Sequence, residues 1–268
     1  MSAETAAEHY EGYGRTEGRV ATSAATRPGF LELVPRNARI LEIGPGHRPC
    51  FSGSNVKYFD VHDAAGLRAR AESVSEDPRG APSKVHYVSP ESDFNVVPDK
   101  SFDVVFSSHA IEHQTDLIRH INDVARVLAP GGAFYVICPD KRYCFDRHIR
   151  ASSIGDVIEA YTTGRRTHRV ADVVDAVVLS SHNDPAQHWR ETAPLPEIQQ
   201  HLVEHAIKAL EDAKGGYIDV HAWRMTPQIF KQITDMVYKL GYSKLKPVRV
   251  YDTPFGSNEF CAILSPDA

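Results

Sequence analysis

The sequence lacks the features by which secreted and membrane-spanning proteins are usually recognised. It has four cysteines and no C-x-x-C pair, so no disulfide framework is indicated. No apolar run approaches the roughly 20 residues that a membrane-spanning helix needs. The segment from Met1 to His9 is polar and has no apolar stretch after a basic start, so we expect no signal peptide. These absences predict a cytoplasmic protein with reduced thiols and no membrane partner.

An excess of positive charge is absent as well. Lysine and arginine number 30 against 35 aspartate and glutamate residues, which gives a formal net charge of −5. We therefore expect no nucleic-acid partner, because such proteins usually need a broad basic surface. The 42% of hydrophobic residues supports a folded core. Two features need an explanation: 268 residues exceed a minimal nucleotide-binding domain, and 14 of them are histidines.

Apolar runs that alternate with helical or loop segments predict a parallel α/β sheet in the first half of the chain. Short runs rich in β-branched and aromatic residues predict five strands, at 38–43, 56–60, 84–88, 102–106 and 133–138. Residues 115–128 carry apolar side chains at helical spacing, and Pro130-Gly131-Gly132 ends this helix.

The rest of the chain changes pattern twice. Residues 141–222 are mostly helical in pattern, and Ser153 with Asp156 predicts a capping box at one helix start. The α/β pattern returns at Thr226-Pro227, which predicts the start of a further helix. Two strands, at 246–251 and 259–264, then close the chain as a hairpin.

These elements predict an α/β fold with a Rossmann-like, mostly parallel sheet of seven strands and a terminal antiparallel hairpin. The predicted units are an N-terminal lid or helical segment, a core in two parts, and a helical insertion after the fifth strand (residues 1–37; 38–140 with 223–268; and 141–222).

The turn Glu42-Ile43-Gly44-Pro45-Gly46, directly after the first strand, is the segment richest in ligand-binding features. Glycines at a strand end let the backbone pass close to a ligand. A dinucleotide site would have a third glycine where this chain has Pro49, which disfavours a pyrophosphate ligand. Asp60, at the end of the second strand, stands where an acidic side chain would hold the hydroxyls of a ribose. A plain turn and a surface aspartate are the alternatives for each feature taken alone.

Four segments in this order resemble the motifs of class I S-adenosylmethionine-dependent methyltransferases of the small-molecule type. They are the glycine turn, the acidic end of the second strand, an S-F-D-x-V segment that continues to Glu112-His113, and an R-x-L-x-P-G-G segment (residues 40–46, 58–60, 101–113 and 126–132). The terminal helix and hairpin resemble the closing antiparallel pair of that family. More loosely, residues 139–143 resemble methyltransferases found with bacterial polysaccharide synthesis.

The resemblance implies S-adenosylmethionine as the cofactor. Glu42 would face its methionine amino end, and Gly44 and Gly46 would line its carboxypropyl chain. Asp60 would accept hydrogen bonds from both ribose hydroxyls. Six further residues are implied as cofactor contacts: Glu91, Ser92 or Asp93 near the adenine, Ser107 and Ser108 near the methionine part, and His113 at the start of the following helix.

The insertion holds seven of the histidines and follows the fifth strand, so it is placed to cover the reacting end of the cofactor. A hydroxyl acceptor needs a general base, and the candidates are His182, His188, His221 and Asp140. Four residues are candidate substrate contacts: Tyr143 and Trp189, which offer aromatic faces, and Arg165 and Arg166, which suit a phosphate or carboxylate.

A metal site in the insertion is left open. His182, Asp184 and His188 could supply three ligands, but spacing alone does not show that they converge. We therefore assign no metal ligand and keep a divalent metal as an option. His201 and His205, four residues apart, fit a solvated helix face.

Two other segments carry weaker expectations. Alternation along an extended chain would put Asp219 and His221 on one side. Tyr10, Tyr13 and Arg15 are expected to form an N-terminal lid over the cofactor, with neighbouring glycines that let it move.

The sequence thus predicts an S-adenosylmethionine-dependent methyltransferase with a small-molecule substrate. A hydroxyl of a sugar or glycan precursor is the favoured acceptor, with a His or Asp general base. Oxygen or nitrogen of an aromatic natural product is the alternative acceptor. A nicotinamide-dependent oxidoreductase and a non-catalytic cofactor binder fit the motifs less well. Pairing of the insertion helices into a homodimer is left open.

Overall fold

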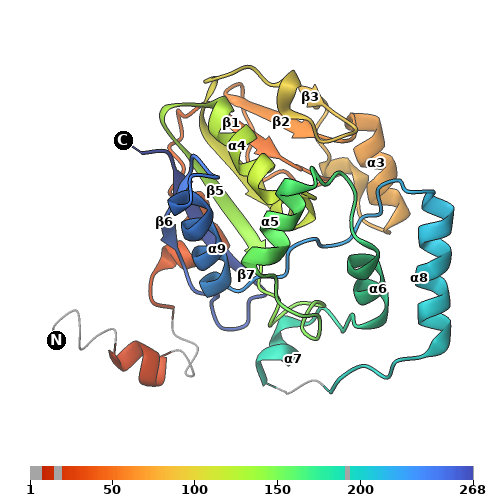
Figure 1. Ribbon diagram of the computed structural model, residues 1–268. Helices are drawn as coiled ribbons and strands as arrows, with labels where there is room; N and C mark the ends of the chain where they lie inside the picture. The colour runs from red at the N-terminus through yellow and green to blue at the C-terminus, as the bar shows by residue number, and fades with distance from the viewer. Residues whose placement is uncertain (1–7, 15–19, 191–193, 268) are drawn as a thin grey trace.

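Seven strands form one mixed sheet in the order β3-β2-β1-β4-β5-β7-β6 (Figure 1). The computed structural model describes residues 8–14, 20–190 and 194–267. The strands are β1 (Ile40–Ile43), β2 (Val56–Asp60), β3 (Tyr87–Val88), β4 (Phe102–Ser108), β5 (Leu128–Pro139), β6 (Lys246–Val250) and β7 (Glu259–Ser265). Strand β7 runs antiparallel to β5 and β6, and the other pairs are parallel. The predicted Rossmann-like fold class is confirmed.

Helices cover both faces of the sheet (Figure 1). They are α2 (Arg27–Leu31), α3 (Ala64–Ser73), α4 (Leu117–Val127), α5 (Ile154–Thr162), α6 (Val170–Val178), α7 (Pro185–Arg190), α8 (Gln200–Ala213) and α9 (Pro227–Lys239). Helices α4, α5 and α9 pack on one face, and α2 and α3 on the other. Within β1, Leu41 joins the first core and Ile40 the second, which explains the unbroken apolar run. No helix in the described residues has the length and apolar character needed to cross a membrane.

Local signals placed several element boundaries correctly and others within a few residues. Ser153 and Asp156 form the predicted capping box at α5, and Thr226 caps α9 with Pro227 in its first turn. Helix α4 ends at Val127 instead of 128, and β5 begins at Leu128 instead of 133. The difference arises because Leu128 already pairs with Phe102, after which the register shifts.

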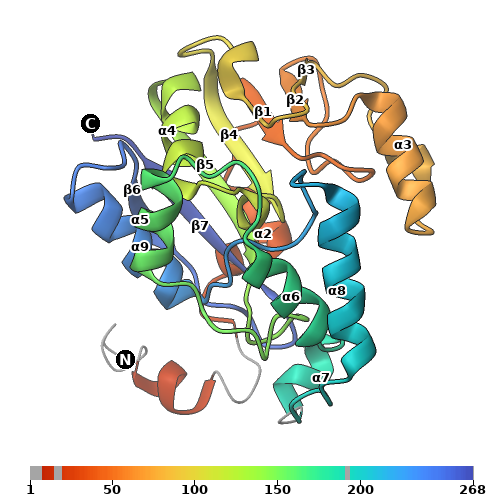
Figure 2. The same cartoon turned by 45° about the vertical axis from the view of Figure 1, so that its right-hand side comes forward.

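The helices of the segment between β5 and α9 stand partly away from the sheet. Helices α6 and α8 lie side by side in both views, with α7 near their lower ends (Figure 1, Figure 2). The connection to the core runs through residues 214–226, which have no regular secondary structure apart from isolated bends and a bridge. This segment returns the chain to α9.

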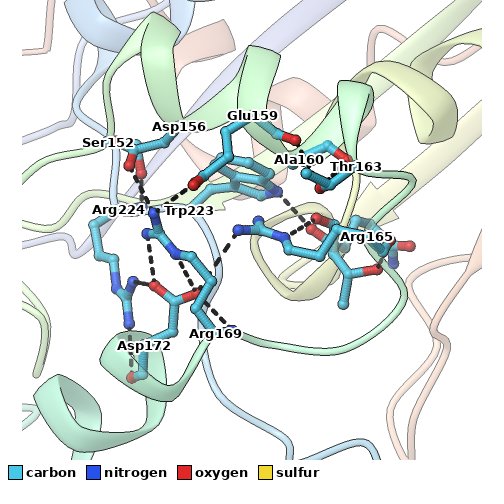
Figure 3. A network of polar contacts seen from close by, with 12 residues as sticks. Ser152, Asp156, Glu159, Ala160, Thr163, Arg165, Arg169, Asp172, Trp223 and Arg224 are labelled. Carbon is cyan, nitrogen blue, oxygen red and sulfur yellow. Dashed lines mark hydrogen bonds and ion pairs between the residues drawn. The ribbon is translucent and has the colours of Figure 1, made fainter.

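A buried ion-pair network fastens α6 to the core (Figure 3). Asp172 on α6 accepts hydrogen bonds from Arg169 Nη2 at 3.0 Å and from Arg224 Nη1 at 2.7 Å. Both Asp172 and Arg224 are buried. Next in the chain, Trp223 Nε1 donates to the carbonyl oxygen of Gln114 at 2.5 Å. The network therefore joins α6 to the loop before α4.

Replacing Asp172 by alanine should destabilise the fold strongly. The guanidinium of Arg224 would stay buried without its carboxylate, which typically costs about 3–5 kcal/mol. Denaturant unfolding at neutral pH measures this free energy. Lys208→Ala is the control, because it removes only an exposed pair with Asp212 and should change stability little. Equal losses in the two variants would contradict this account of the network.

A second prediction concerns acid stability and His120. This side chain is buried on α4 between the rings of Phe94 and Phe134, and burial lowers the pKa of His120 to about 3. The unfolded chain takes up a proton at this histidine near pH 6.5, whereas the folded chain does so only near pH 3. The contribution of His120 to the free energy of unfolding is therefore complete above pH 6.5 and is lost as the pH falls toward 3. Between pH 7 and pH 4 the loss is about 3 kcal/mol. In the His120→Leu variant, the change in the free energy of unfolding between pH 7 and pH 4 should be smaller by that amount. An unchanged pH dependence would contradict this role of His120.

Candidate functional site

A cavity of about 660 Å³ opens at the carboxyl ends of β1, β2 and β4. Gly44 and Gly46 after β1, Asp60 at the end of β2, and His109 after β4 line its wall. Strand β1 lies between β2 and β4. The connection after β1 therefore runs to one side of it, and the connection after β3 returns to β4 on its other side. Ligands of doubly wound sheets bind at such a switch point, in cavities of about 300–1,000 Å³.

The glycine turn has the backbone that the sequence predicts. Gly44 and Gly46 have φ angles of +65° and +55°, which side chains rarely allow. A Cβ atom on Gly44 would lie 3.1 Å from the Cβ atom of Ala110, whereas one on Gly46 would have no heavy atom within 4 Å. The turn therefore brings bare backbone to the cavity, as a bound cofactor chain requires.

Asp60 faces the same cavity. Its Oδ1 accepts a hydrogen bond from the backbone N–H of His62 at 2.9 Å, which fixes the carboxylate at the strand end. Burial raises the pKa of Asp60 above its ordinary value. A carboxylate held here can accept hydrogen bonds from a ribose diol.

Glu42 supports the turn from behind and is absent from the described lining of the cavity. Its Oε1 and Oε2 accept hydrogen bonds from the backbone N–H groups of Cys50 at 2.7 Å and Phe51 at 3.1 Å. Burial raises the pKa of Glu42 to about 7, against the effect of these hydrogen bonds. Glu42 thus holds the loop after the glycine turn, and its predicted contact with the methionine amino end stays a prediction.

His109 is a lining residue that sequence reasoning did not select. It adopts a left-handed φ of +51°, and its Nε2 lies 2.8 Å from Glu259 Oε2. Arg27 donates two hydrogen bonds to the same carboxylate. Although burial raises the pKa of Glu259, its hydrogen bonds with His109 and Arg27 lower it to about 2. Glu259 therefore stays charged and fixes His109 at the cavity rim.

A second cavity, of about 400 Å³, adjoins the first. The two share four lining residues: Pro90, His113, Gln114 and Tyr217. Glu91 and Ser92, expected near adenine, line the second cavity together with Arg119 and Arg166. Asp93 lies outside both linings and instead caps a short 3-10 helix through Asn95. Arg119 was not selected from the sequence, although its buried Nε has no hydrogen-bond partner in the described residues.

Glu112, His113 and His221 meet beside these cavities, and we call them the Glu112 cluster. The Nε2 atoms of His113 and His221 each lie 3.9 Å from Glu112 Oε1. The backbone N–H groups of Ala222 and Trp223 both donate to the carbonyl oxygen of Glu112. This backbone contact places His221 against the 3-10 turn that follows β4.

Two carboxylates stand behind the histidines of the cluster. Asp146 Oδ2 lies 2.6 Å from His221 Nδ1, and Asp219 Oδ1 lies 2.9 Å from His113 Nδ1. Burial lowers the pKa of His113, but the contacts with Asp219 and Glu112 outweigh it and raise the pKa. The contact with His113 also lowers the pKa of Asp219. Asp146 lies 75 residues from His221 in the chain, and no sequence signal selected it.

The other proposed bases lie apart from this cluster. Asp140 is fully buried and bound by Arg142, with Thr253 Oγ1 donating to its Oδ2 at 2.6 Å. The rings of His182 and His188 stack with centroids 4.0 Å apart, and His188 Nε2 lies 2.8 Å from the carbonyl oxygen of His182. None of the three appears in the described lining of the two cavities. Of the four proposed bases, only His221 belongs to the Glu112 cluster, and it too lies outside the described linings of the two cavities.

The predicted substrate contacts are also divided. Tyr143 and Trp189 stack on each other with centroids 3.8 Å apart, and Trp189 Nε1 donates to Ser257. Arg165 lies over the Trp223 ring and donates to the carbonyl oxygen of Thr115. None of these three side chains is in the described lining of the two cavities, although Thr115, the partner of Arg165, lines the second. Arg166 alone lines one of them.

Three further expectations can be placed. Ser107 is fully buried at the end of β4 and Ser108 is half-buried beside it, and neither is in the described lining of the cavities. Asp184 accepts a hydrogen bond from Gln187 N, and the optional metal set of His182, Asp184 and His188 is not among the converging ligand groups of the described residues. Tyr10 and Tyr13 lie in a π-helical turn, Tyr10–Gly14, that contributes no described lining residue, and Arg15 lies outside the described residues.

Comparison with known proteins assigns the central part of the chain. Residues 44–136 match a family described as a methyltransferase domain. This segment contains the end of the glycine turn, Asp60, and the strands β4 and β5 up to residue 136. No curated protein matches the chain significantly.

Several solved structures are similar at low sequence identity. An S-adenosylmethionine-dependent methyltransferase from Mesorhizobium loti is 18% identical, with 91% of this chain and 98% of that chain covered and a TM-score of 0.44. A protein from Rhodobacter sphaeroides described as a zinc-dependent alcohol dehydrogenase is 14% identical, with 100% of both chains covered and a TM-score of 0.45. DhpI in complex with SAH is 15% identical, with 98% and 92% covered and a TM-score of 0.41. At these TM-scores the likenesses support no conclusion about activity.

The family match, the sheet order and the cavity agree with one another. They confirm the resemblance to class I S-adenosylmethionine-dependent methyltransferases. Residues 44–136 therefore form a methyltransferase domain, and the cofactor of this domain is S-adenosylmethionine.

Asp60→Ala should weaken cofactor binding. Each hydrogen bond to a charged group contributes about 1.5–3 kcal/mol, so the Kd for S-adenosylhomocysteine should rise at least about tenfold in titration calorimetry. Asp63→Ala is the matched control, because Asp63 caps α3 through Gly66 N and stands outside the described lining of the cavity. Its Kd should stay that of the wild type. An unchanged Kd in Asp60→Ala would contradict the prediction that this carboxylate binds the ribose.

Proposed function

We propose that the protein transfers a methyl group to a hydroxyl of a small acceptor of the sugar or glycan-precursor type. The observation that carries this proposal is the Glu112 cluster beside the cofactor cavity. His113 lines both cavities, and His221 lies directly behind it, with ring centroids 4.7 Å apart. A carboxylate–histidine group at this position suits an acceptor whose proton must be removed.

The reaction defines what the side chains must do. The acceptor oxygen forms a bond to the methyl carbon while the carbon–sulfur bond breaks and its electron pair passes to sulfur. The hydroxyl proton must leave at the same time, and we assign its removal to the Glu112 cluster. His221 is the favoured general base, because Asp146 orients its Nδ1 at 2.6 Å and leaves Nε2 facing Glu112 and His113.

The second cavity supports an acceptor that also carries a negative charge. Arg119 and Arg166 line it, and guanidinium groups pair well with phosphate or carboxylate groups. A phosphorylated or nucleotide-linked sugar has both the hydroxyl and the anionic group. An aromatic natural product is the weaker alternative, because Tyr143 and Trp189 already stack on each other.

The proposed division of labour follows the chain. The core of residues 38–140 and 223–268 binds the cofactor, and the segment 141–222 completes the acceptor side with residues such as Asp146, Arg166 and His221. The N-terminal segment 1–37 remains the proposed lid. A cytoplasmic location, inferred from reduced thiols, belongs to the same proposal.

A methyl-transfer screen with labelled cofactor over sugar phosphates, nucleotide sugars, phenols and amines tests the acceptor class. We expect turnover with a hydroxylated, anionic sugar compound. In that assay His221→Ala should lower kcat by about 10²–10⁴, the usual contribution of a positioned base. The His188 ring contacts the carbonyl oxygen of His182, away from the Glu112 cluster. The His188→Ala variant should therefore keep the wild-type rate. Turnover confined to amines, or a fully active His221→Ala variant, would contradict the proposal.

A further inference from the structure

We propose that Glu112, His113 and His221 bind a divalent first-row transition-metal ion, such as Mn²⁺, Co²⁺ or Zn²⁺. The first observation is the state of Glu112. Its side chain is fully buried, and both carboxylate oxygens lack a hydrogen-bond partner in the described residues, with His109 Nδ1 and the Nε2 atoms of His113 and His221 each 3.9 Å from Oε1. A buried carboxylate is costly unless it is hydrogen-bonded, paired or bound to a metal.

The second observation is the convergence of ligand atoms. The ligating atoms of Glu112, His113 and His221 all lie within 4.8 Å of one another, in the one such group found among the described residues. Both Nε2 atoms stand 3.9 Å from Glu112 Oε1. With bonds of about 2.0–2.2 Å to one ion, ligand atoms lie about 3–3.5 Å apart, so small side-chain shifts complete the site.

The third observation is the pair of carboxylates behind the imidazoles. Asp219 contacts His113 at Nδ1, and Asp146 contacts His221 at Nδ1. Metal-binding histidines typically place their second ring nitrogen on such a carboxylate, which fixes the tautomer and turns the other nitrogen to the metal. Here both Nε2 atoms are thereby turned toward Glu112. The His221–Asp146 contact is a hydrogen bond at 2.6 Å, and the His113–Asp219 contact is an ion pair at 2.9 Å. Together they favour a built ligand set over a chance polar cluster.

The donor set indicates the kind of ion. Two imidazoles and one carboxylate suit transition metals, whereas Mg²⁺ and Ca²⁺ prefer oxygen ligands. Three protein ligands leave a coordination position open. His113 lines both cavities, so that position can face an acceptor hydroxyl. The ion would then lower the pKa of this hydroxyl and let its proton pass to water before the oxygen takes the methyl group. This role rests on the proposed hydroxyl acceptor and takes the place of His221 as general base, because a metal-bound Nε2 cannot accept the proton; binding of the ion rests on neither.

The first test is binding of the metal alone. Chelator-treated protein is titrated with Co²⁺, followed by its visible absorption, and with Mn²⁺ by calorimetry. We expect one equivalent to bind to the wild type. Glu112→Gln and His221→Ala should lose this binding, and Asp146→Asn should weaken it about 10- to 100-fold, as outer carboxylate partners do. Thermal melts of the metal-free proteins show that the variants are folded.

The exposed pair His201 and His205 provides the control. Two histidines four residues apart on a helix can hold a transition metal by themselves, so the double variant His201→Ala/His205→Ala removes this competing site. It should keep the stoichiometric ion. Absence of a stoichiometric ion in the wild type, or binding lost in the double variant and kept in Glu112→Gln, overturns the proposal.

Transfer assays separate this inference from the proposed function. An ion that binds at the Glu112 cluster while no hydroxylated acceptor is methylated supports the site and contradicts the proposed acceptor. Full transfer to a hydroxyl by metal-free protein contradicts the catalytic role of the ion and supports the general base instead.

Discussion

The site depends on one backbone contact, in which the carbonyl oxygen of Glu112 accepts the N–H groups of both Ala222 and Trp223. These residues are about 110 positions apart, so the contact closes a long loop that contains β5 and the five helices α4 to α8. It sets His221 beside Glu112 and, two residues earlier, Asp219 beside His113. The same segment supplies Tyr217 and Asp219 to the lining of the cofactor cavity.

Closing such a loop is entropically costly, and buried polar contacts hold it in place. The Trp223 indole donates to Gln114, and Arg224 pairs with Asp172 on α6. Removal of one partner from such a network leaves a buried charge unpaired, so its members are strongly coupled. The acceptor side therefore depends on residues that touch neither cofactor nor acceptor.

The place of the first cavity could be predicted because its signals are local. The turn with Gly44 and Gly46 follows its strand directly, and Asp60 ends the next one, so strand pattern and glycine chemistry suffice. The family resemblance then supplied the roles. Glu42 shows the limit of such reasoning, because its two oxygens are already engaged by the backbone of the following loop.

The acceptor side could not be predicted in the same way, because its contacts join distant segments. Histidine content pointed to the segment that holds His221, but His182 and His188 stack on each other, and only His221 joins the Glu112 cluster. Asp140 follows β5 as expected for a base, yet its neighbour Arg142 pairs with it. Spacing in sequence does not reveal which histidine meets which carboxylate in space.

A crystal structure with bound S-adenosylhomocysteine tests the central claim most directly, because it locates the reacting sulfur. The account predicts ribose hydroxyls on Asp60, the homocysteine chain along Gly44 and Gly46, and the sulfur facing His113. A sulfur that faces away from His113, or a nucleoside bound outside the cavity at the ends of β1, β2 and β4, would contradict it.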